Sequence, residues 1–173
     1  MKLLGISGSL RADSCNTKLV REAAALFDPS AFTMADIRFP LYDGDLEAEG
    51  VPEAVRTFHR QIGEADAIVI SCPEYNKGLS GVMKNALDWA SRIKPMPFRD
   101  KPVAIMSAAA GRAGGERSQM TLRHCLVAFR PRLLQGPELM VARASEAFEG
   151  DRLADEQARE ILVELMAELR AMV

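Results

Sequence analysis

The sequence contains only three cysteines, an odd number, and two histidines, and no CxxC pair occurs in it. Disulfide frameworks and zinc sites need paired or clustered ligands, so neither is expected here. No apolar run approaches the roughly 18 residues that span a bilayer, and no signal-peptide pattern opens the chain. These absences predict a protein of the reducing cytoplasm without a membrane segment.

The chain also has little net charge. The formal charge of -2 and the pI near 5.8 offer no field for nucleic acid or for an anionic membrane surface. Two phosphate-binding motifs are missing, because the glycines fit neither GxGxxG nor GxxxxGK[ST]. With 173 residues, 48% of them hydrophobic, we expect residues 1–173 to form a single domain with a substantial core.

Apolar patterning predicts strands that alternate with helices. Strands are expected at residues 2–7, 32–39, 65–72, 102–108 and 132–140, and helices at residues 16–27, 51–62, 80–93, 116–129 and 155–172. Continuous apolar runs such as 65–72 are typical of strands that are covered on both faces of a parallel sheet. The pattern predicts a three-layer α/β domain with a five-stranded parallel sheet, a polar loop at 40–50 and a core position for Trp89.

Three unusual loops follow strand ends, where ligands bind in such sheets. The first, residues 8–17, offers the hydroxyls of Ser9 and Ser14, the amide of Asn16 and the guanidinium of Arg11 at a helix start. These groups suit a monophosphate. A simple helix cap is the alternative, but a cation at a helix start is unfavourable unless an anion binds there.

The second loop, residues 73–80, presents backbone amides and Tyr75, which suit one edge of a planar heterocycle; a polar turn before a helix capped by Ser80 is the alternative. The third loop, residues 108–115, is rich in glycine. Gly111, Gly114 and Gly115 allow close backbone approach to a ligand, although a flexible surface loop explains them equally well.

Three stretches together, "GSLRADSCN", "PEYNKGLSGVMKNALDWASR" and "GRAGGERSQMTLRHCL", resemble the NADPH-dependent FMN reductase family of flavodoxin-like proteins. The resemblance covers roughly two thirds of the chain, and the family includes quinone, chromate and azo-dye reductases. It implies a flavodoxin-like sheet of order 2-1-3-4-5, and a homodimer or homotetramer with FMN near the subunit interface.

The resemblance also implies a binding site and a reaction. The implied FMN-binding residues are Ser9, Arg11, Ser14 and Asn16 at the phosphate, Pro73, Glu74, Tyr75, Asn76 and Lys77 along the ring, and Ser107 and Gly111 beside it. NADPH or NADH would give hydride to flavin N5, and a small acceptor (a quinone, FMN, chromate or an azo compound) would take the electrons by a ping-pong mechanism without a catalytic side chain. The alternatives are a flavodoxin-like electron carrier, which Arg11 and the modest charge disfavour, and a binder of a non-flavin phosphate.

Two segments depart from the family pattern. The chain reads "KGLSGV" where sequences like "YSIPGV" occur, and "AAAGRAGG" where "PGPFGG" is common. Both border the expected space above the flavin, so they bear on the choice of acceptor. An ammonium of Lys77 near the flavin would raise its reduction potential by about 30 mV for each 1.4 kcal/mol. A solvated loop lysine is the alternative.

Overall fold

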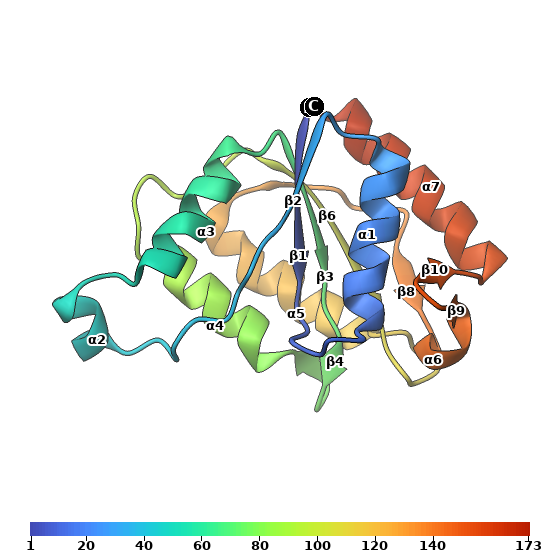
Figure 1. Ribbon diagram of the computed structural model, residues 1–173, viewed down its shortest axis with the longest axis horizontal. Coiled ribbons are helices and arrows are strands. Elements are labelled where there is room, and N and C mark those ends of the chain that lie inside the picture. The colour runs from blue at the N-terminus through green and yellow to red at the C-terminus, as the bar shows by residue number, and fades with distance from the viewer.

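The computed structural model describes residues 1–173, which form a mostly parallel sheet between two layers of helices (Figure 1). The strand order is β2 (Ala31–Met34), β1 (Lys2–Ser7), β3 (Ala67–Ser71), β6 (Pro102–Ala108) and then β7 (Arg132–Leu133) and β8 (Leu139–Val141). Neighbouring strands of this sheet pair in parallel. The flavodoxin-like order 2-1-3-4-5 is confirmed, with two short strands in the fifth place.

Two hydrophobic cores lie on the two faces of the sheet. Helices α1 (Cys15–Phe27) and α7 (Glu156–Ala171) cover one face, while α3 (Glu53–Glu64), α4 (Gly81–Ala90) and α5 (Glu116–Leu126) cover the other. Every residue of β3 is buried, and its side chains alternate between the cores. The continuous apolar run therefore arises from burial on both faces.

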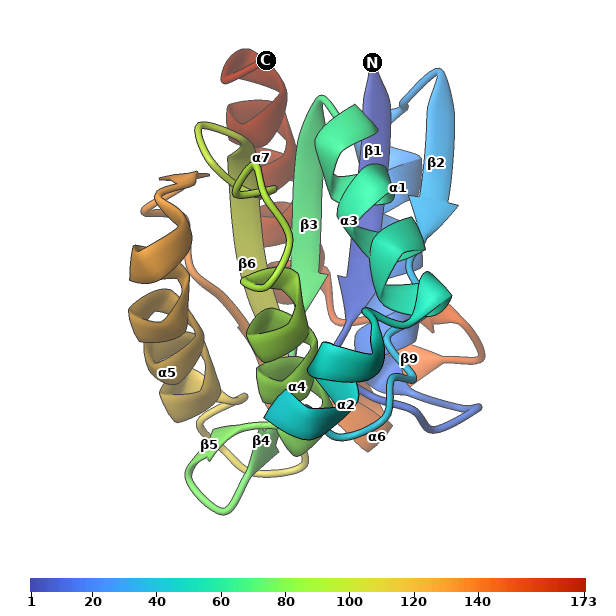
Figure 2. The same ribbon diagram turned by 90° about the vertical axis from the view of Figure 1, so that its left-hand side faces the viewer.

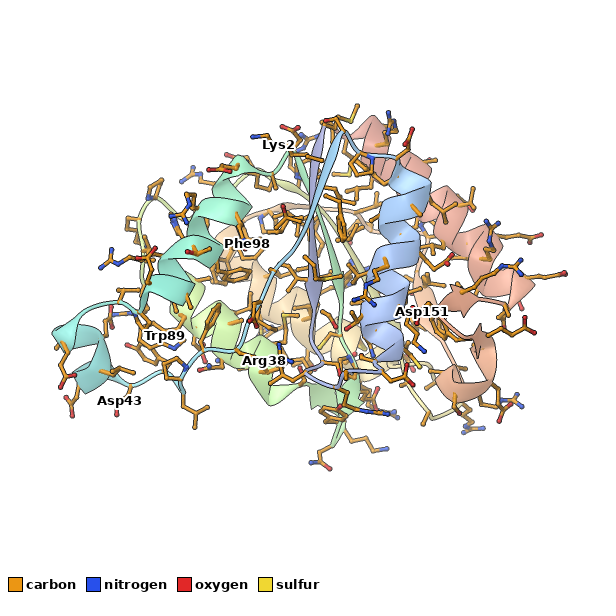
Figure 3. All side chains as sticks on the ribbon, in the orientation of Figure 1. Lys2, Arg38, Asp43, Trp89, Phe98 and Asp151 are labelled. Carbon is orange, nitrogen blue, oxygen red and sulfur yellow. The ribbon has the colours of Figure 1, made fainter.

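Trp89, on α4, is a buried residue, as predicted. Its side chain is fully buried, its indole N–H donates to the carbonyl of Pro40 over 2.9 Å, and Tyr42 packs against it edge-on. Figure 3 shows Trp89 on the α3–α4 side of the sheet, together with Phe98.

Several predicted boundaries were wrong. The strand expected at 32–39 ends at Met34, and the loop expected at 40–50 contains α2 (Gly44–Glu49), whose first turn is capped by Asp43. The strand expected at 132–140 is divided around Gly136 and Pro137, so that β7 pairs with the start of β6 and β8 pairs with its end. The helix expected at 116–129 is α-helical to Leu126 and ends in the 3-10 turn η1 (Val127–Phe129). The short elements α6 (Ala144–Ala147), β9 (Phe148–Glu149) and β10 (Arg152–Leu153) were not predicted.

The carboxyl ends of the central strands lie together at one edge, at the bottom of Figure 2. The loops after β1, β3 and β6 meet there, and the loop after β3 forms a small hairpin of β4 (Glu74–Tyr75) and β5 (Gly78–Leu79). None of the helices is both long and apolar enough to cross a membrane. The sheet therefore brings the three candidate loops to one place.

Candidate functional site

A cleft of about 520 Å³, here called the main cleft, opens at this edge of the sheet. Its walls are the loop after β1, residues 73–75 after β3, residues 108–110 after β6, and part of the segment from Ala144 to Gly150. Among the predicted site residues it brings together Ser9, Arg11, Ser14, Asn16, Pro73, Glu74 and Tyr75. Asn76, Lys77, Ser107 and Gly111 do not line it.

The start of α1 forms an anion cradle, defined as Ser9, Arg11, Ser14 and the backbone amides of Cys15 and Asn16. The Ser14 hydroxyl accepts from the amide of Thr17, and the Ser14 carbonyl accepts from the amide of Lys18. The amides of Cys15 and Asn16 have no acceptor in the protein, and the Arg11 guanidinium makes no hydrogen bond or ion pair. Open amides at the positive end of a helix, beside a free cation, fit a phosphate group.

Asn16 has a structural role at the floor of this cleft. Its side chain is buried; Nδ2 donates to the carbonyl of Ala108 over 2.9 Å, and Oδ1 accepts from Ser71 Oγ over 2.8 Å and from the Ala108 amide over 3.1 Å. These bonds join α1 to the ends of β3 and β6. The predicted contact between the Asn16 side chain and phosphate stays a prediction: one Nδ2 N–H donates to Ala108, and the phosphate would need the other.

Lys18 connects two walls of the main cleft, the loop after β1 and the segment around Gly150. Its Nζ lies 2.5 Å from the Asp13 carboxylate and 3.5 Å from that of Asp151, and it donates to the carbonyl of Gly150 over 2.8 Å. The hydrogen bond from Lys18 lowers the pKa of Asp13, and the same bond raises the pKa of Lys18. Both groups are therefore charged at neutral pH, and Asp13 does not leave an unpaired negative charge beside the cradle.

The second loop reaches the cleft with only its first residues. Asn76 and Lys77 form the tip of the β4–β5 hairpin with positive φ angles of 49° and 69°, the pattern of a tight two-residue turn. Lys77 is exposed. The Glu74 carboxylate accepts from the backbone amide of Arg117 over 3.0 Å, which ties the hairpin to α5.

The third loop packs against the protein itself. Ser107 is buried, donates to the carbonyl of Gly114 over 2.7 Å and accepts from Gln119 Nε2 over 2.9 Å. A Cβ on Gly114 would lie 2.5 Å from the Met140 carbonyl oxygen, and one on Gly115 would lie 2.8 Å from Ser107 Oγ. These two glycines are required by packing within the protein, which corrects the expectation that they admit a ligand; the backbone of 108–110 lines the cleft instead.

Comparison with known proteins decides the family. The model of the NADPH-dependent FMN reductase family matches residues 1–146. The chain belongs to that family. It is 45% identical to an NAD(P)H-dependent FMN reductase of Pseudomonas aeruginosa, over the whole chain and 95% of the relative. It is 39% identical to a quinone reductase of Escherichia coli, over 81% of this chain and 77% of the relative.

A solved structure agrees with this assignment. The flavoenzyme NAD(P)H:acceptor oxidoreductase of Paracoccus denitrificans superposes with a TM-score of 0.87 at 29% identity, covering 99% of this chain and 96% of that one. This FMN reductase family member is therefore an oxidoreductase that uses FMN, with NAD(P)H as its co-substrate.

One wall of the reductase's cleft could not be found from the sequence. Phe148 and Gly150 line the main cleft from the β9 end, beyond the last residue that the family model matches. Strands of two residues carry no measurable periodicity, so no pattern identified this segment. In the structure, Lys18 holds this segment in place through Gly150 and Asp151, and Gly150 is 132 positions away in the sequence.

The structure favours the solvated alternative for Lys77 of the reductase. Because Lys77 lies at the exposed hairpin tip and does not line the main cleft, we expect Lys77→Ala to leave the flavin midpoint potential unchanged. A redox titration of the FMN-loaded variant and parent measures this. A lowered potential in the variant would show that the ammonium reaches the flavin.

Proposed function

We propose that this reductase transfers two electrons from NAD(P)H through FMN to quinones and related small acceptors, among them free FMN, chromate and azo compounds. The observation that carries the proposal is that an open anion cradle and two loop segments, residues 73–75 and 108–110, meet in one cleft. The printed names of relatives in bacteria and plants, quinone reductase and NADPH:quinone oxidoreductase, support the choice of acceptor.

FMN is proposed to lie in the main cleft with its phosphate in the anion cradle. Ser9, Arg11, Ser14 and the amides of Cys15 and Asn16 would donate to the phosphate oxygens. The backbone of 73–75 and 108–110 would line the isoalloxazine, with Ser107 and Gly111 supporting the second segment from behind and Asn76 and Lys77 beyond its edge. When bound, FMN supplies the chemistry, since its N5 accepts hydride and its reduced form delivers two electrons.

The protein's own part in the reaction is to bind and orient. No side chain of the cleft is proposed as an acid or a base, because solvent supplies the protons that a reduced quinone takes up. Burial raises the pKa of the Cys72 thiol next to the cleft, which keeps that thiol protonated and unreactive. NAD(P)H and the acceptor are proposed to use the same space in turn, which gives ping-pong kinetics.

The proposal also covers the cellular compartment and the oligomeric state of the protein. We place the single domain, residues 1–173, in the cytoplasm, consistent with three cysteines that are all free. The proposed assembly is a homodimer or homotetramer, and the proposed partners are small molecules.

One preparation tests this function. The purified protein should be yellow or should bind added FMN, and it should then oxidise NADPH or NADH when benzoquinone is present. Initial rates at several concentrations of both substrates should give parallel double-reciprocal lines. A colourless protein that FMN cannot reconstitute would refute the proposal, and a flavoprotein that oxidises neither coenzyme would be an electron carrier instead.

A further inference from the structure

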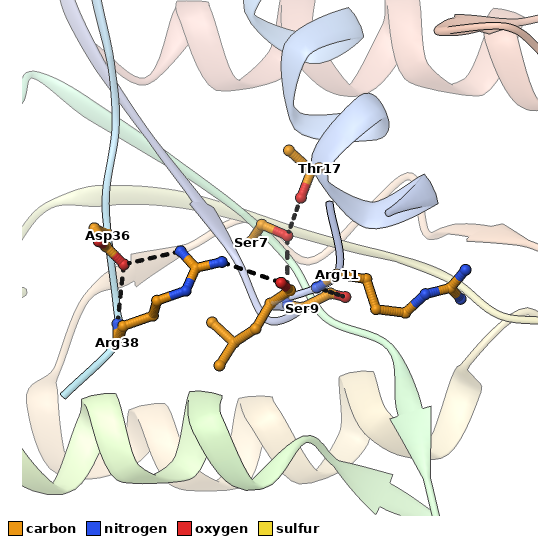
Figure 4. Close-up of polar contacts among 7 residues, drawn as sticks. Ser7, Ser9, Arg11, Thr17, Asp36 and Arg38 are labelled. Carbon is orange, nitrogen blue, oxygen red and sulfur yellow. Dashed lines mark hydrogen bonds and ion pairs between the residues drawn. The ribbon is translucent and has the colours of Figure 1, made fainter. Parts of the chain in front are cut away.

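A second cleft, of about 200 Å³, lies between the loop after β1 and the end of β2. Its lining includes Arg11, Arg21 and Arg38, and Asp36 is its one acidic residue. We call it the arginine cleft. The Arg11 side chain points to the other side of the loop from Arg38 (Figure 4), so the groups that charge this cleft are the guanidinium groups of Arg21 and Arg38 and the carboxylate of Asp36. The flavin reaction as proposed above uses neither Arg21 nor Arg38.

The Arg38 guanidinium makes two hydrogen bonds within the protein and keeps unused N–H donors. It donates to Asp36 Oδ1 over 3.3 Å and to the carbonyl of Leu10 over 3.0 Å, so three of its five N–H groups stay open. Figure 4 shows Arg38 bridging to the loop from one side, while the Arg11 side chain leaves the loop on the other. Arg21, exposed on α1, makes no hydrogen bond or ion pair. Arg21 and Arg38 therefore both keep N–H donors that no acceptor of the protein uses.

The position of this cleft in the fold suggests which anion it takes. Strands β1 and β2 are parallel neighbours, so the end of β2 lies beside the loop that follows β1. In dinucleotide-binding folds, an acidic side chain at that place binds a ribose hydroxyl, and an arginine there accommodates a 2′-phosphate. The loop after β1 holds the pyrophosphate in those folds and is assigned to FMN here, so the comparison concerns only the group bound at the end of β2. Here the Asp36 carboxylate is already paired with Arg38, and Arg21 adds a further charge. This arrangement suits a phosphate monoester better than a hydroxyl group.

The arginine cleft is also connected to the main cleft. A cavity of about 390 Å³ shares Ser9, Leu10 and Arg11 with the arginine cleft, and it shares Tyr75 with the main cleft. An extended ligand thus has a continuous path across the loop after β1. A dinucleotide is such a ligand, because its reactive ring and its adenosine phosphate are far apart.

We propose that the arginine cleft binds the 2′-phosphate of NADPH through Arg21 and Arg38, while the nicotinamide enters the main cleft beside Tyr75. This inference rests on the proposed function, since it assigns one end of the co-substrate to a site of its own. It makes NADPH the preferred coenzyme of this reductase.

Arg21→Ala tests the proposal without disturbing a bond within the protein. Titration calorimetry on the FMN-loaded protein should show adenosine 2′,5′-bisphosphate binding about tenfold more weakly to the variant, while adenosine 5′-monophosphate binds both proteins equally. The ratio kcat/KM for NADPH should fall about tenfold, and that for NADH should change less than twofold. Arg159→Ala, an exposed site on α7, removes the same charge elsewhere and should change neither value.

Asp36→Asn should have the opposite effect on the affinity for adenosine 2′,5′-bisphosphate. It keeps an oxygen at the place of Oδ1 but removes the charge that neutralises Arg38, so the bisphosphate should bind more tightly. A parent that uses NADH as well as NADPH, or an Arg21→Ala variant with unchanged bisphosphate affinity, would overturn this inference alone. A parent that oxidises neither coenzyme would refute the proposed function itself.

Discussion

Arg11→Ala should weaken FMN binding by about 10- to 100-fold, the range expected when a charge-assisted bond to phosphate is lost. Arg11 is the free cation of the anion cradle, and it forms no bond within the protein whose loss would disturb the fold. Titration of the apoprotein with FMN, followed by the quenching of flavin fluorescence, measures the affinity. The free energy of unfolding of the apoprotein should stay unchanged.

Riboflavin provides the matched control for this variant, because it has the ring but lacks the phosphate. Arg11→Ala should bind riboflavin as well as the parent does, so the whole loss should appear in the difference between the two ligands. Equal losses for FMN and riboflavin would show that Arg11 acts on the ring or on the loop, and that the phosphate lies elsewhere.

Asn16→Ala should lower the free energy of unfolding of the apoprotein by about 3–5 kcal/mol, a large part of the 5–15 kcal/mol typical of a domain. The substitution leaves the hydroxyl of Ser71 and both backbone groups of Ala108 without their partner in a buried place. Urea unfolding without FMN measures the loss. FMN affinity should fall as well, because the bonds that hold the start of α1 against the sheet are gone.

Asn85→Ala is the control for Asn16→Ala. Asn85 is a similarly buried asparagine that bonds the backbone of Tyr42 and Pro40, and it does not line the main cleft. Asn85→Ala should lower the free energy of unfolding and leave the FMN affinity of the folded protein unchanged. If Asn16→Ala instead lost FMN without losing stability, its amide would be a direct ligand of the phosphate, as the family resemblance implied.

Much of the fold follows from burial patterns that are local in the sequence. The continuous apolar run of β6 predicted a strand of the observed length, and the helix expected at 16–27 begins one residue earlier, at Cys15, with Ser14 as its cap. The β2 prediction failed because Ala35 and Ile37 are buried outside the sheet, where they continue the alternating pattern without strand pairing. An alternating pattern indicates which side chains are buried, but it does not indicate whether the backbone pairs with a neighbouring strand.

The candidate site was predicted less completely, because its side chains act over long separations in the sequence. The roles of Asn16 and Ser107 depend on partners that come from other elements of the fold, and no local pattern indicates such partners. Asn16 bonds a residue 92 positions away. The position of the three loops after strand ends correctly predicted that they meet at one edge of the sheet, whereas the positions of Lys77 and Gly111 needed the structure.

The bond between Lys18 and Gly150 has a consequence for the order of events during synthesis. The residues proposed to bind the phosphate emerge from the ribosome early, and the β9–β10 hairpin that completes the wall of the main cleft emerges late. A nascent chain that has not yet released that hairpin should hold FMN poorly, so capture of the cofactor coincides with completion of translation. Binding then stabilises only the finished protein, because a ligand favours whichever state can bind it.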